Sequence, residues 1–202
     1  MEYKWLNNKN NSKIIVFFNG WGMDENIVKH LEPEDFDVLM FYDYNNLVTD
    51  FDFKTLDKYT QKYLIAWSMG VMTATLFDIK YDKKIAINGT LKPIDNKYGI
   101  PVKIYDLTLK GLTKESIKKF TDNMFSEPVN IEIGRNFENQ KSELLSLISY
   151  NANENFKYDK VIISSNDKIF PTKNQTNYWN INANLESGHA PFKLFKYWSE
   201  IL

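Results

Sequence analysis

The sequence predicts an α/β fold built on a mostly parallel central sheet. Short runs of β-branched and aromatic residues alternate along the chain with stretches of helical spacing, an order that favours parallel strands joined by right-handed crossovers. The clearest run, Lys-Ile-Ile-Val-Phe-Phe at Lys13–Phe18, is apolar without alternation, as in a strand covered on both faces. With 202 residues and neither an internal repeat nor a low-complexity linker, the chain is predicted to form one domain, residues 1–202.

Further strands are predicted from similar runs before and after this one. Residues 2–6 are expected to form an antiparallel edge strand, and residues 177–180 are a candidate for a last strand. The other predicted strands are residues 38–42, 63–67, 84–87 and 160–164. Helices are predicted between the strands at about residues 24–31, 54–63, 69–77 and 192–202.

Composition argues against several classes of protein. The formal net charge is −1, so the chain has no general electrostatic attraction for nucleic acid. The absence of cysteine removes disulfides, thiolate nucleophiles and cysteine-ligated zinc. No apolar run reaches the roughly 18 residues that a membrane span needs, and the first residues lack the apolar segment of a signal peptide. A cytoplasmic protein that binds neither membranes nor nucleic acid is expected.

A serine stands where a predicted strand meets a predicted helix. Residues 63–70 read Tyr-Leu-Ile-Ala-Trp-Ser-Met-Gly, which is the nucleophile-elbow pattern of α/β-hydrolases with Ala66 in place of the first glycine. Alanine is small enough to leave room for the tight turn. The hydroxyl of Ser68 is therefore predicted to be a nucleophile that a neighbouring base activates.

The chain offers two histidines as the base, His30 and His189. His189 lies in the loop Glu-Ser-Gly-His-Ala-Pro-Phe and follows the serine, as the chain order of α/β-hydrolases requires. His30 lies at the end of a predicted helix, where a solvated histidine is ordinary. His189 is therefore the predicted general base.

An acid that orients the histidine is expected between the serine and the histidine in the chain. Asp167 lies just beyond the predicted strand 160–164, at the edge where a parallel sheet presents residues to its ligand. Asp159 is the alternative, but it precedes the same strand and is expected at the opposite end of the sheet. Asp167 is therefore the predicted acid.

Two backbone amides are predicted to stabilise the oxyanion of the reaction. One is the amide of Met69, which follows the nucleophile at the start of a helix, where free N–H groups gather. The other is the amide of Trp21, in the glycine-rich loop Phe-Asn-Gly-Trp-Gly-Met after the strand Lys13–Phe18. A plain glycine turn is the alternative interpretation of this loop.

No convincing strand is found between residues 105 and 156. Residues 113–125 and 139–150 have helical spacing, with apolar residues on one face. We interpret residues 105–156, approximately, as a small helical lid inserted between two strands of the sheet and covering the active site. The alternative is two ordinary crossover helices.

Four short motifs together resemble one known family. They are Phe-Asn-Gly-Trp-Gly-Met at residues 18–23, Ala-Trp-Ser-Met-Gly at 66–70, Asn-Asp-Lys-Ile-Phe-Pro at 166–171 and Gly-His-Ala-Pro-Phe at 188–192. These segments are similar to those of pimeloyl-[acyl-carrier protein] methyl ester esterases of biotin synthesis. The short chain and the segment Ile-Asn-Gly-Thr-Leu-Lys-Pro-Ile at residues 87–94 are most similar to the compact BioG-type branch. The tryptophan before the serine and the His-Ala-Pro-Phe run are the most specific of these features.

The resemblance implies an α/β-hydrolase fold with a reduced number of flanking helices. It implies that the methyl ester of pimeloyl-[acyl-carrier protein] is the substrate, that the carrier protein is the partner, and that no metal or organic cofactor is needed. It also implies an apolar slot for the acyl chain, although packing in an ordinary core is the alternative for each lining residue. The candidate lining residues are Trp21, Trp67, Phe120, Met124, Phe125, Leu144 and Ile148.

Members of the family meet acidic carrier proteins with basic lid residues, which suggests three residues here. Lys114 and Lys118 are one helical turn apart and could share a face, and Arg135 is the only arginine in the chain. The planar guanidinium of arginine suits a phosphate or a carboxylate. An ordinary solvated face is the alternative, because acidic residues are interspersed through the same segment.

Two other functions stay open at this point. An acyl thioesterase or a general small-ester esterase would use the same catalytic residues, because the pocket sets the substrate. A non-catalytic binding protein on the hydrolase fold is the second alternative, although the intact serine, acid and histidine argue against it. A monomer is expected.

Overall fold

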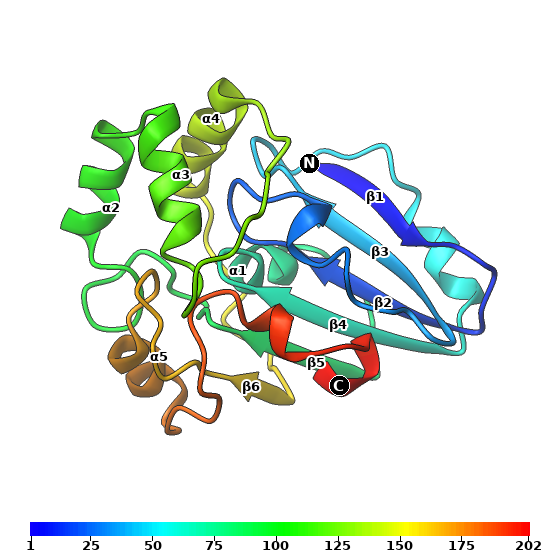
Figure 1. The fold of residues 1–202 in the computed structure, drawn as a ribbon. Helices are drawn as coiled ribbons and strands as arrows, with labels where there is room; N and C mark the ends of the chain where they lie inside the picture. Colours follow the sequence, from blue (N-terminus) through cyan, green and yellow to red (C-terminus); the bar gives the residue numbers. More distant parts are fainter.

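A six-stranded sheet forms the centre of the structure, a computed structural model that describes residues 1–202 (Figure 1). The strand order is β1-β3-β2-β4-β5-β6, in which β1 runs antiparallel to β3 and all other neighbours are parallel. The predicted mostly parallel sheet and its antiparallel edge strand are therefore confirmed. The strands are β1 (Glu2–Asn7), β2 (Lys13–Phe18), β3 (Phe36–Tyr42), β4 (Gln61–Trp67), β5 (Lys83–Ile87) and β6 (Lys160–Ile162).

The central strand β2 shows why the sequence contains unbroken apolar runs. Ile14, Val16 and Phe18 pack into the hydrophobic core on one face of the sheet, and Ile15 and Phe17 pack into a second core on the other face. All five side chains are fully buried. Because successive side chains of a strand point to opposite faces, a strand covered on both sides has no position for a polar residue.

Most of the helices predicted between the strands are single turns or 3₁₀ turns in the structure. The stretch 24–31 contains only the 3₁₀ turn Glu25–Ile27, and the stretch 54–63 only the 3₁₀ turn Phe53–Lys58. The stretch 69–77 is the single-turn helix α1 (Gly70–Thr73) followed by a 3₁₀ turn. The predicted C-terminal helix is also wrong, because Tyr197 forms a β-bridge with Glu32 that separates two 3₁₀ turns.

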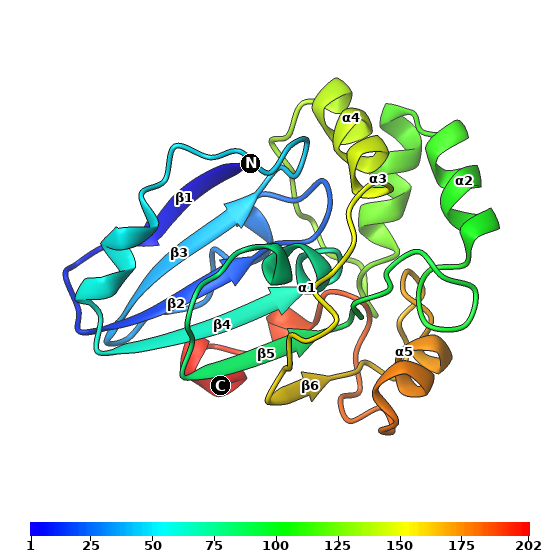
Figure 2. The same ribbon diagram turned by 180° about the vertical axis from the view of Figure 1, so that it is seen from behind.

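Three helices lie between β5 and β6 in the chain: α2 (Val102–Lys110), α3 (Lys114–Asp122) and α4 (Phe137–Leu147). Figures 1 and 2 show them beside one another, beyond the end of the sheet to which the parallel strands point. The helical character predicted for residues 113–125 and 139–150 is confirmed. Helix α2 was not expected, and it begins three residues before the predicted start of the insertion at residue 105.

The candidate last strand at residues 177–180 is wrong. These residues end helix α5 (Thr172–Trp179), which starts after Pro171 and stops at Asn180 in the left-handed conformation (φ 54°). The rings of Tyr178 and Trp179 on this helix pack against each other with their centroids 4.8 Å apart. Nowhere does the structure contain a helix with the length and apolar character needed to cross a membrane.

Candidate active site

The serine predicted as nucleophile stands on a sharp turn between β4 and α1. Ser68 has φ of +57°, a left-handed conformation that is uncommon for a residue other than glycine. The second glycine of the elbow is required, because a Cβ atom on Gly70 would lie 2.3 Å from the carbonyl oxygen of Phe18. Ala66 fits at the position of the first glycine, where it is fully buried and pairs with Phe18 and Ala86 in the neighbouring strands. The turn holds a strained backbone with the Ser68 side chain directed out of the sheet.

Ser68, His189 and Asp167 form one hydrogen-bonded chain. The hydroxyl oxygen of Ser68 lies 2.9 Å from His189 Nε2, and His189 Nδ1 lies 2.8 Å from Asp167 Oδ2. Because a carboxylate only accepts hydrogen bonds, Nδ1 carries the hydrogen and Nε2 is free to accept from the serine. All three residues are more than nine-tenths buried. The three residues predicted from the sequence thus have the relative geometry of a nucleophile, a base and an orienting acid.

Asp167 is held in place by the loop that follows β6. Its Oδ1 accepts hydrogen bonds from the amides of Ile169 (2.9 Å) and Phe170 (2.8 Å), and its Oδ2 accepts a bond from the side chain of Gln175 (3.0 Å). The alternative acid, Asp159, accepts a bond from the amide of Lys84 at the start of β5. That position is at the opposite end of the sheet, as expected.

The backbone of His189 is fixed by two side chains from neighbouring strand ends. Its carbonyl oxygen accepts hydrogen bonds from Trp67 Nε1 and from Asn88 Nδ2, each at 2.8 Å. The Trp67 ring also lies 5.2 Å from the imidazole ring, and Trp67 is fully buried. The other histidine, His30, bonds to the carbonyl of Phe192 instead (2.9 Å). Asn88 was not identified from the sequence, where Asn88-Gly89 indicated only the end of a strand.

The loop after β2 leaves one backbone amide unused. Of the five N–H groups from Asn19 to Met23, four donate hydrogen bonds within the protein, to Phe41 O, Asn19 Oδ1, Glu143 Oε2 and Gly20 O. The fifth, that of Trp21, donates none, and neither does the amide of Met69. Because backbone amides in an interior are nearly always paired, two free amides next to a candidate nucleophile suit an external acceptor. The loop passes close to Ser68, since a Cβ atom on Gly20 would lie 3.3 Å from Ser68 Cβ.

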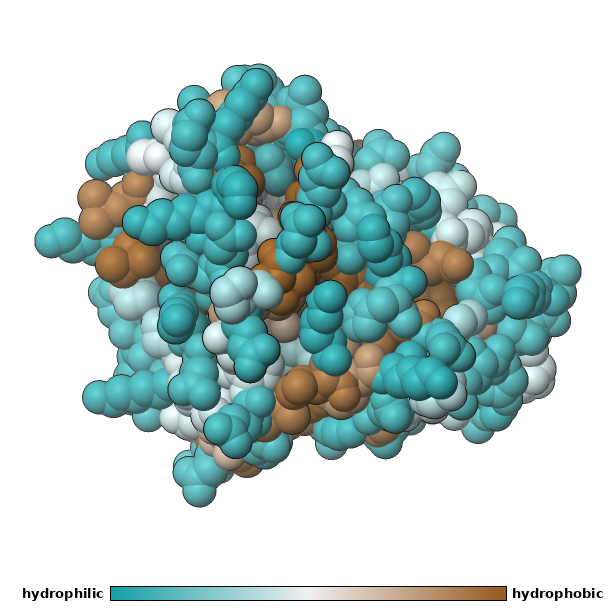
Figure 3. Space-filling model, in the orientation of Figure 1, coloured by the Kyte–Doolittle hydropathy of each residue, from teal (hydrophilic) through white to brown (hydrophobic).

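A pocket of about 170 Å³ opens directly above Ser68. Five of the residues predicted to line an acyl slot line this pocket: Trp21, Trp67, Phe120, Met124 and Leu144. Helix α2 supplies further apolar lining from Ile104 and Tyr105, and Lys168 is the one charged lining residue. Ile104 is half-exposed, and Figure 3 shows hydrophobic atoms at the surface in the region of α2.

Two residues predicted to line the slot lie elsewhere. Phe125 follows the end of α3 and packs into the hydrophobic core on the face of the sheet that bears Ile15 and Phe17. Trp67 belongs to the same core cluster. Ile148 lies one turn beyond Leu144, at the C-cap of α4, where it is half-exposed and borders a surface hollow with Leu91. Ile148 follows the last residue of α4, Leu147, and is not among the residues that line the pocket above Ser68.

Comparison with known proteins identifies the family. A family model described as "Pimeloyl-ACP methyl esterase BioG" matches residues 1–201. The chain belongs to the BioG family. It is therefore a carboxylic-ester hydrolase on the α/β-hydrolase fold, as the sequence motifs predicted.

Three individual proteins are similar to this chain to different extents. The crystal structure of BioG from Haemophilus influenzae is 32% identical, with a TM-score of 0.89, and the alignment covers 100% of this chain and 99% of that chain. A malonyl-[acyl-carrier protein] O-methyltransferase from Bacteroides fragilis is 37% identical over 199 residues. That alignment covers 90% of this chain but only 40% of the relative. An esterase from Thermogutta terrifontis shares the fold, with a TM-score of 0.64 at 11% identity over 94% of this chain and 86% of that chain.

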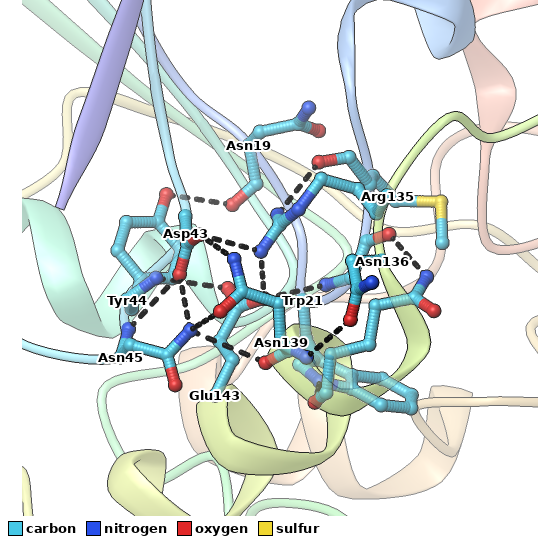
Figure 4. Close-up of polar contacts among 12 residues, drawn as sticks. Asn19, Trp21, Asp43, Tyr44, Asn45, Arg135, Asn136, Asn139 and Glu143 are labelled. Atoms are coloured by element: carbon cyan, nitrogen blue, oxygen red, sulfur yellow. Dashed lines mark hydrogen bonds and ion pairs between the residues drawn. The ribbon is translucent and has the colours of Figure 1, made fainter.

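Arg135 does not have the surface role that was suggested for it in this BioG-family chain. Its side chain is only 6% exposed, and its Nη2 lies 3.0 Å from Asp43 Oδ2 and 3.1 Å from Glu143 Oε2 (Figure 4). A guanidinium that is already paired with two carboxylates inside the protein is not available to an external phosphate. Lys114 and Lys118 do lie at the surface along one side of α3, and Lys118 pairs with Asp122 at 3.5 Å.

Proposed function

We propose that this protein hydrolyses the methyl ester of pimeloyl-[acyl-carrier protein] methyl ester, giving pimeloyl-[acyl-carrier protein] and methanol. In this proposal Ser68 is the nucleophile, His189 the general base and Asp167 the acid that orients the histidine. The observation that carries it is the unbroken hydrogen-bonded chain from Ser68 through His189 to Asp167, with distances of 2.9 and 2.8 Å, in a chain of the BioG family.

The first half-reaction forms an acyl-enzyme. The oxygen of Ser68 attacks the ester carbonyl carbon while its proton passes to His189 Nε2, and the carbonyl oxygen becomes an oxyanion. The unused amides of Trp21 and Met69 donate hydrogen bonds to this oxyanion. When the tetrahedral intermediate collapses, the bond to the methoxy group breaks and His189 returns its proton, so that methanol leaves.

The second half-reaction releases the acid. Water takes the place of methanol, gives a proton to His189 and attacks the acyl carbon, forming a second oxyanion at the same two amides. Its collapse breaks the bond to Ser68, which recovers the proton from His189. The product carries a free carboxyl group on the carrier-bound chain. The side chains of this protein supply every proton transfer that these steps need.

The pocket suits an acyl chain that enters from one side. Its lining is mostly apolar, and helices α2, α3 and α4 cover it, which supports the interpretation of the insertion as a lid. A volume of about 170 Å³ holds part of an acyl chain but no carrier protein, so the thioester end must extend out of the pocket, past an exposed lining residue such as Ile104 or Lys168. Lys114 and Lys118 on the neighbouring helix α3 remain candidates for contact with an acidic carrier.

The relative from Bacteroides fragilis supports a methyl ester on a carrier protein. Its name describes methyl transfer to an acyl group on the acyl-carrier protein, and a region like this chain makes up 40% of its length. A methyl ester made by such a transfer is the bond that an esterase of this family would later remove. The two chemistries are complementary, which favours the carrier-bound methyl ester over a free small ester.

Mass spectrometry of the carrier protein tests the proposal. Methyl-pimeloyl carrier protein is incubated with the enzyme, and loss of the methyl group alone is the expected result. Loss of the whole acyl chain would instead show a thioesterase, and no change with the wild-type enzyme would contradict the proposal. The Ser68→Ala variant is the matched control, and its turnover is expected to fall by about 10⁵- to 10⁶-fold.

A further inference from the structure

Helix α4 holds the peptide groups on both sides of Gly22. Gly22 N–H donates to Glu143 Oε2 (3.2 Å), and Gly22 O accepts from Gln140 Nε2 (2.8 Å). The indole of Trp21 donates to the backbone carbonyl of Gln140 (2.7 Å). Three hydrogen bonds from residues more than 115 positions away in the chain therefore meet at the loop that carries the free Trp21 amide (Figure 4).

The loop needs this support because of its sequence. Trp21 stands between two glycines, and Gly22 has φ of +71°, so local sterics do little to fix the orientation of the peptides on either side. The peptide that contains the Trp21 amide is oriented by one bond of 3.3 Å, from Met23 N–H to Gly20 O. That bond keeps its geometry only while the backbone between Trp21 and Met23 stays in place, and this is the part that Gln140 and Glu143 hold.

Glu143 is itself held by donors from three segments. Its Oε1 accepts from the amide of Tyr44 (3.0 Å), and its Oε2 accepts from Arg135 Nη2 (3.1 Å) as well as from Gly22. The side chain is completely buried. Arg135 also donates to Met23 O (3.3 Å) and pairs with Asp43, so it ties the end of the same loop to the carboxylate. An acceptor with two oxygens is required at position 143, because every group within hydrogen-bond distance is a donor.

We propose that Gln140 and Glu143 are positioning residues that hold the Trp21 amide in the direction needed to bind the oxyanion formed at Ser68. This inference rests on the proposed function, since it assigns the support of the same oxyanion site. It gives helix α4 a second role beside covering the pocket: the insertion carries part of the machinery that orients the oxyanion loop. Neither residue touches the reacting atoms.

Two substitutions test the role without removing the fold. Gln140→Met keeps the size of the side chain and deletes the donor to Gly22 O, and the bond from Trp21 to the backbone of residue 140 remains possible. Glu143→Gln keeps the shape but places an amide group among donors. Lys141→Ala, at an exposed position on the same helix, is the matched control. Each variant is assayed on a p-nitrophenyl ester and on the carrier-bound methyl ester.

The inhibitor measurement separates positioning from a merely structural effect. A long-chain alkyl trifluoromethyl ketone adds to Ser68 and places an oxyanion at the two amides, whereas the corresponding alcohol does not. Loss of one oxyanion donor typically lowers kcat by about 10²- to 10³-fold, so a misdirected donor should lower kcat by about 10- to 100-fold at nearly constant KM. The ketone should lose affinity by the same factor, and the alcohol should bind as it does to the wild type.

Four outcomes would overturn the inference or its basis. Folded Gln140→Met and Glu143→Gln with wild-type kcat and ketone affinity would overturn the positioning role. Equal losses of ketone and alcohol binding would show a collapsed pocket instead, and would overturn it as well. Wild-type enzyme that cleaves the p-nitrophenyl ester but not the carrier-bound ester would overturn the proposed substrate alone, and the comparison of variants would still decide the positioning role. Wild-type enzyme inert on both esters would overturn both proposals.

Discussion

Replacing Glu143 by glutamine is expected to change how the stability of the protein depends on pH. Burial beside the carboxylate of Asp43 raises the pKa of Glu143 from 4.5 to about 7, against the opposing effects of Arg135 and of two backbone amides. The folded protein therefore keeps a proton on Glu143 between about pH 4.5 and pH 7 that the unfolded chain has lost. Glutamine at this position cannot titrate.

The sign and size of the effect follow from this difference in bound protons. Stability falls with rising pH wherever the folded state binds more protons than the unfolded state. The contribution of Glu143 is thus fully present below about pH 4.5 and is lost as the pH rises through about 7. A difference between 4.5 and about 7 corresponds to about 3 kcal/mol. Relative to the wild type, Glu143→Gln should gain about this much stability between pH 4.5 and pH 8.

Urea unfolding at a series of pH values between 4.5 and 8 measures the difference. The quantity of interest is the free energy of unfolding of the variant minus that of the wild type, at unchanged m-value. Glu138→Gln, at an exposed position on the same helix, serves as the control and should give a flat difference. A flat difference for Glu143→Gln would refute the raised pKa. A difference that falls with pH would show that Arg135 and the amides outweigh burial.

Two further predictions concern the proposed catalytic residues. Asp167→Asn should lower kcat by about 10⁴-fold by allowing the wrong imidazole tautomer, while Asp159→Asn, at the other end of the sheet, should keep wild-type kcat; equal effects of the two changes would contradict the assignment. Trp67→Phe deletes the buried hydrogen bond to the carbonyl of His189 and some packing, and should lower the free energy of unfolding by about 1–3 kcal/mol in denaturant titrations. The kcat of Trp67→Phe should also fall, because the carbonyl of His189 loses one of its two side-chain hydrogen bonds. A destabilised variant with unchanged kcat would limit Trp67 to a packing role.

Ser68, His189 and Asp167 could be predicted because the local sequence around each residue indicates its role. Ser68 and Asp167 follow strand ends, His189 lies in a loop bounded by glycine and proline, and their order in the chain is that of the fold. The oxyanion loop was recognisable for the same reason, since its glycines lie directly after β2. These features depend on neighbours in sequence, which are visible without a structure.

Asn88, Gln140 and Glu143 were missed because their partners lie far away along the chain. A signal for two of them was nevertheless present. Gln140, Glu143, Leu144 and Leu147 follow the i, i+3, i+4, i+7 spacing of one helix face, and all four are buried. Two polar residues on a face that otherwise packs into a core indicate buried polar partners. Arg135 was misinterpreted for the same reason: its partners, Asp43 and Glu143, are recognisable only once β3 and α4 meet.

The buried carboxylate of Glu143 illustrates why a site can keep a group that lowers stability. Three donors converge on it, from Gly22, Tyr44 and Arg135, and an apolar residue there would leave all three unpaired inside the protein. A protonated carboxyl group would satisfy them poorly, because its hydrogen needs an acceptor and every neighbour within reach donates. The ionised form, which costs the most to bury, is thus the form that holds the oxyanion loop best. Stability and positioning should therefore change in opposite directions as the pH rises through about 7, with the fold becoming less stable while the Trp21 amide becomes better held.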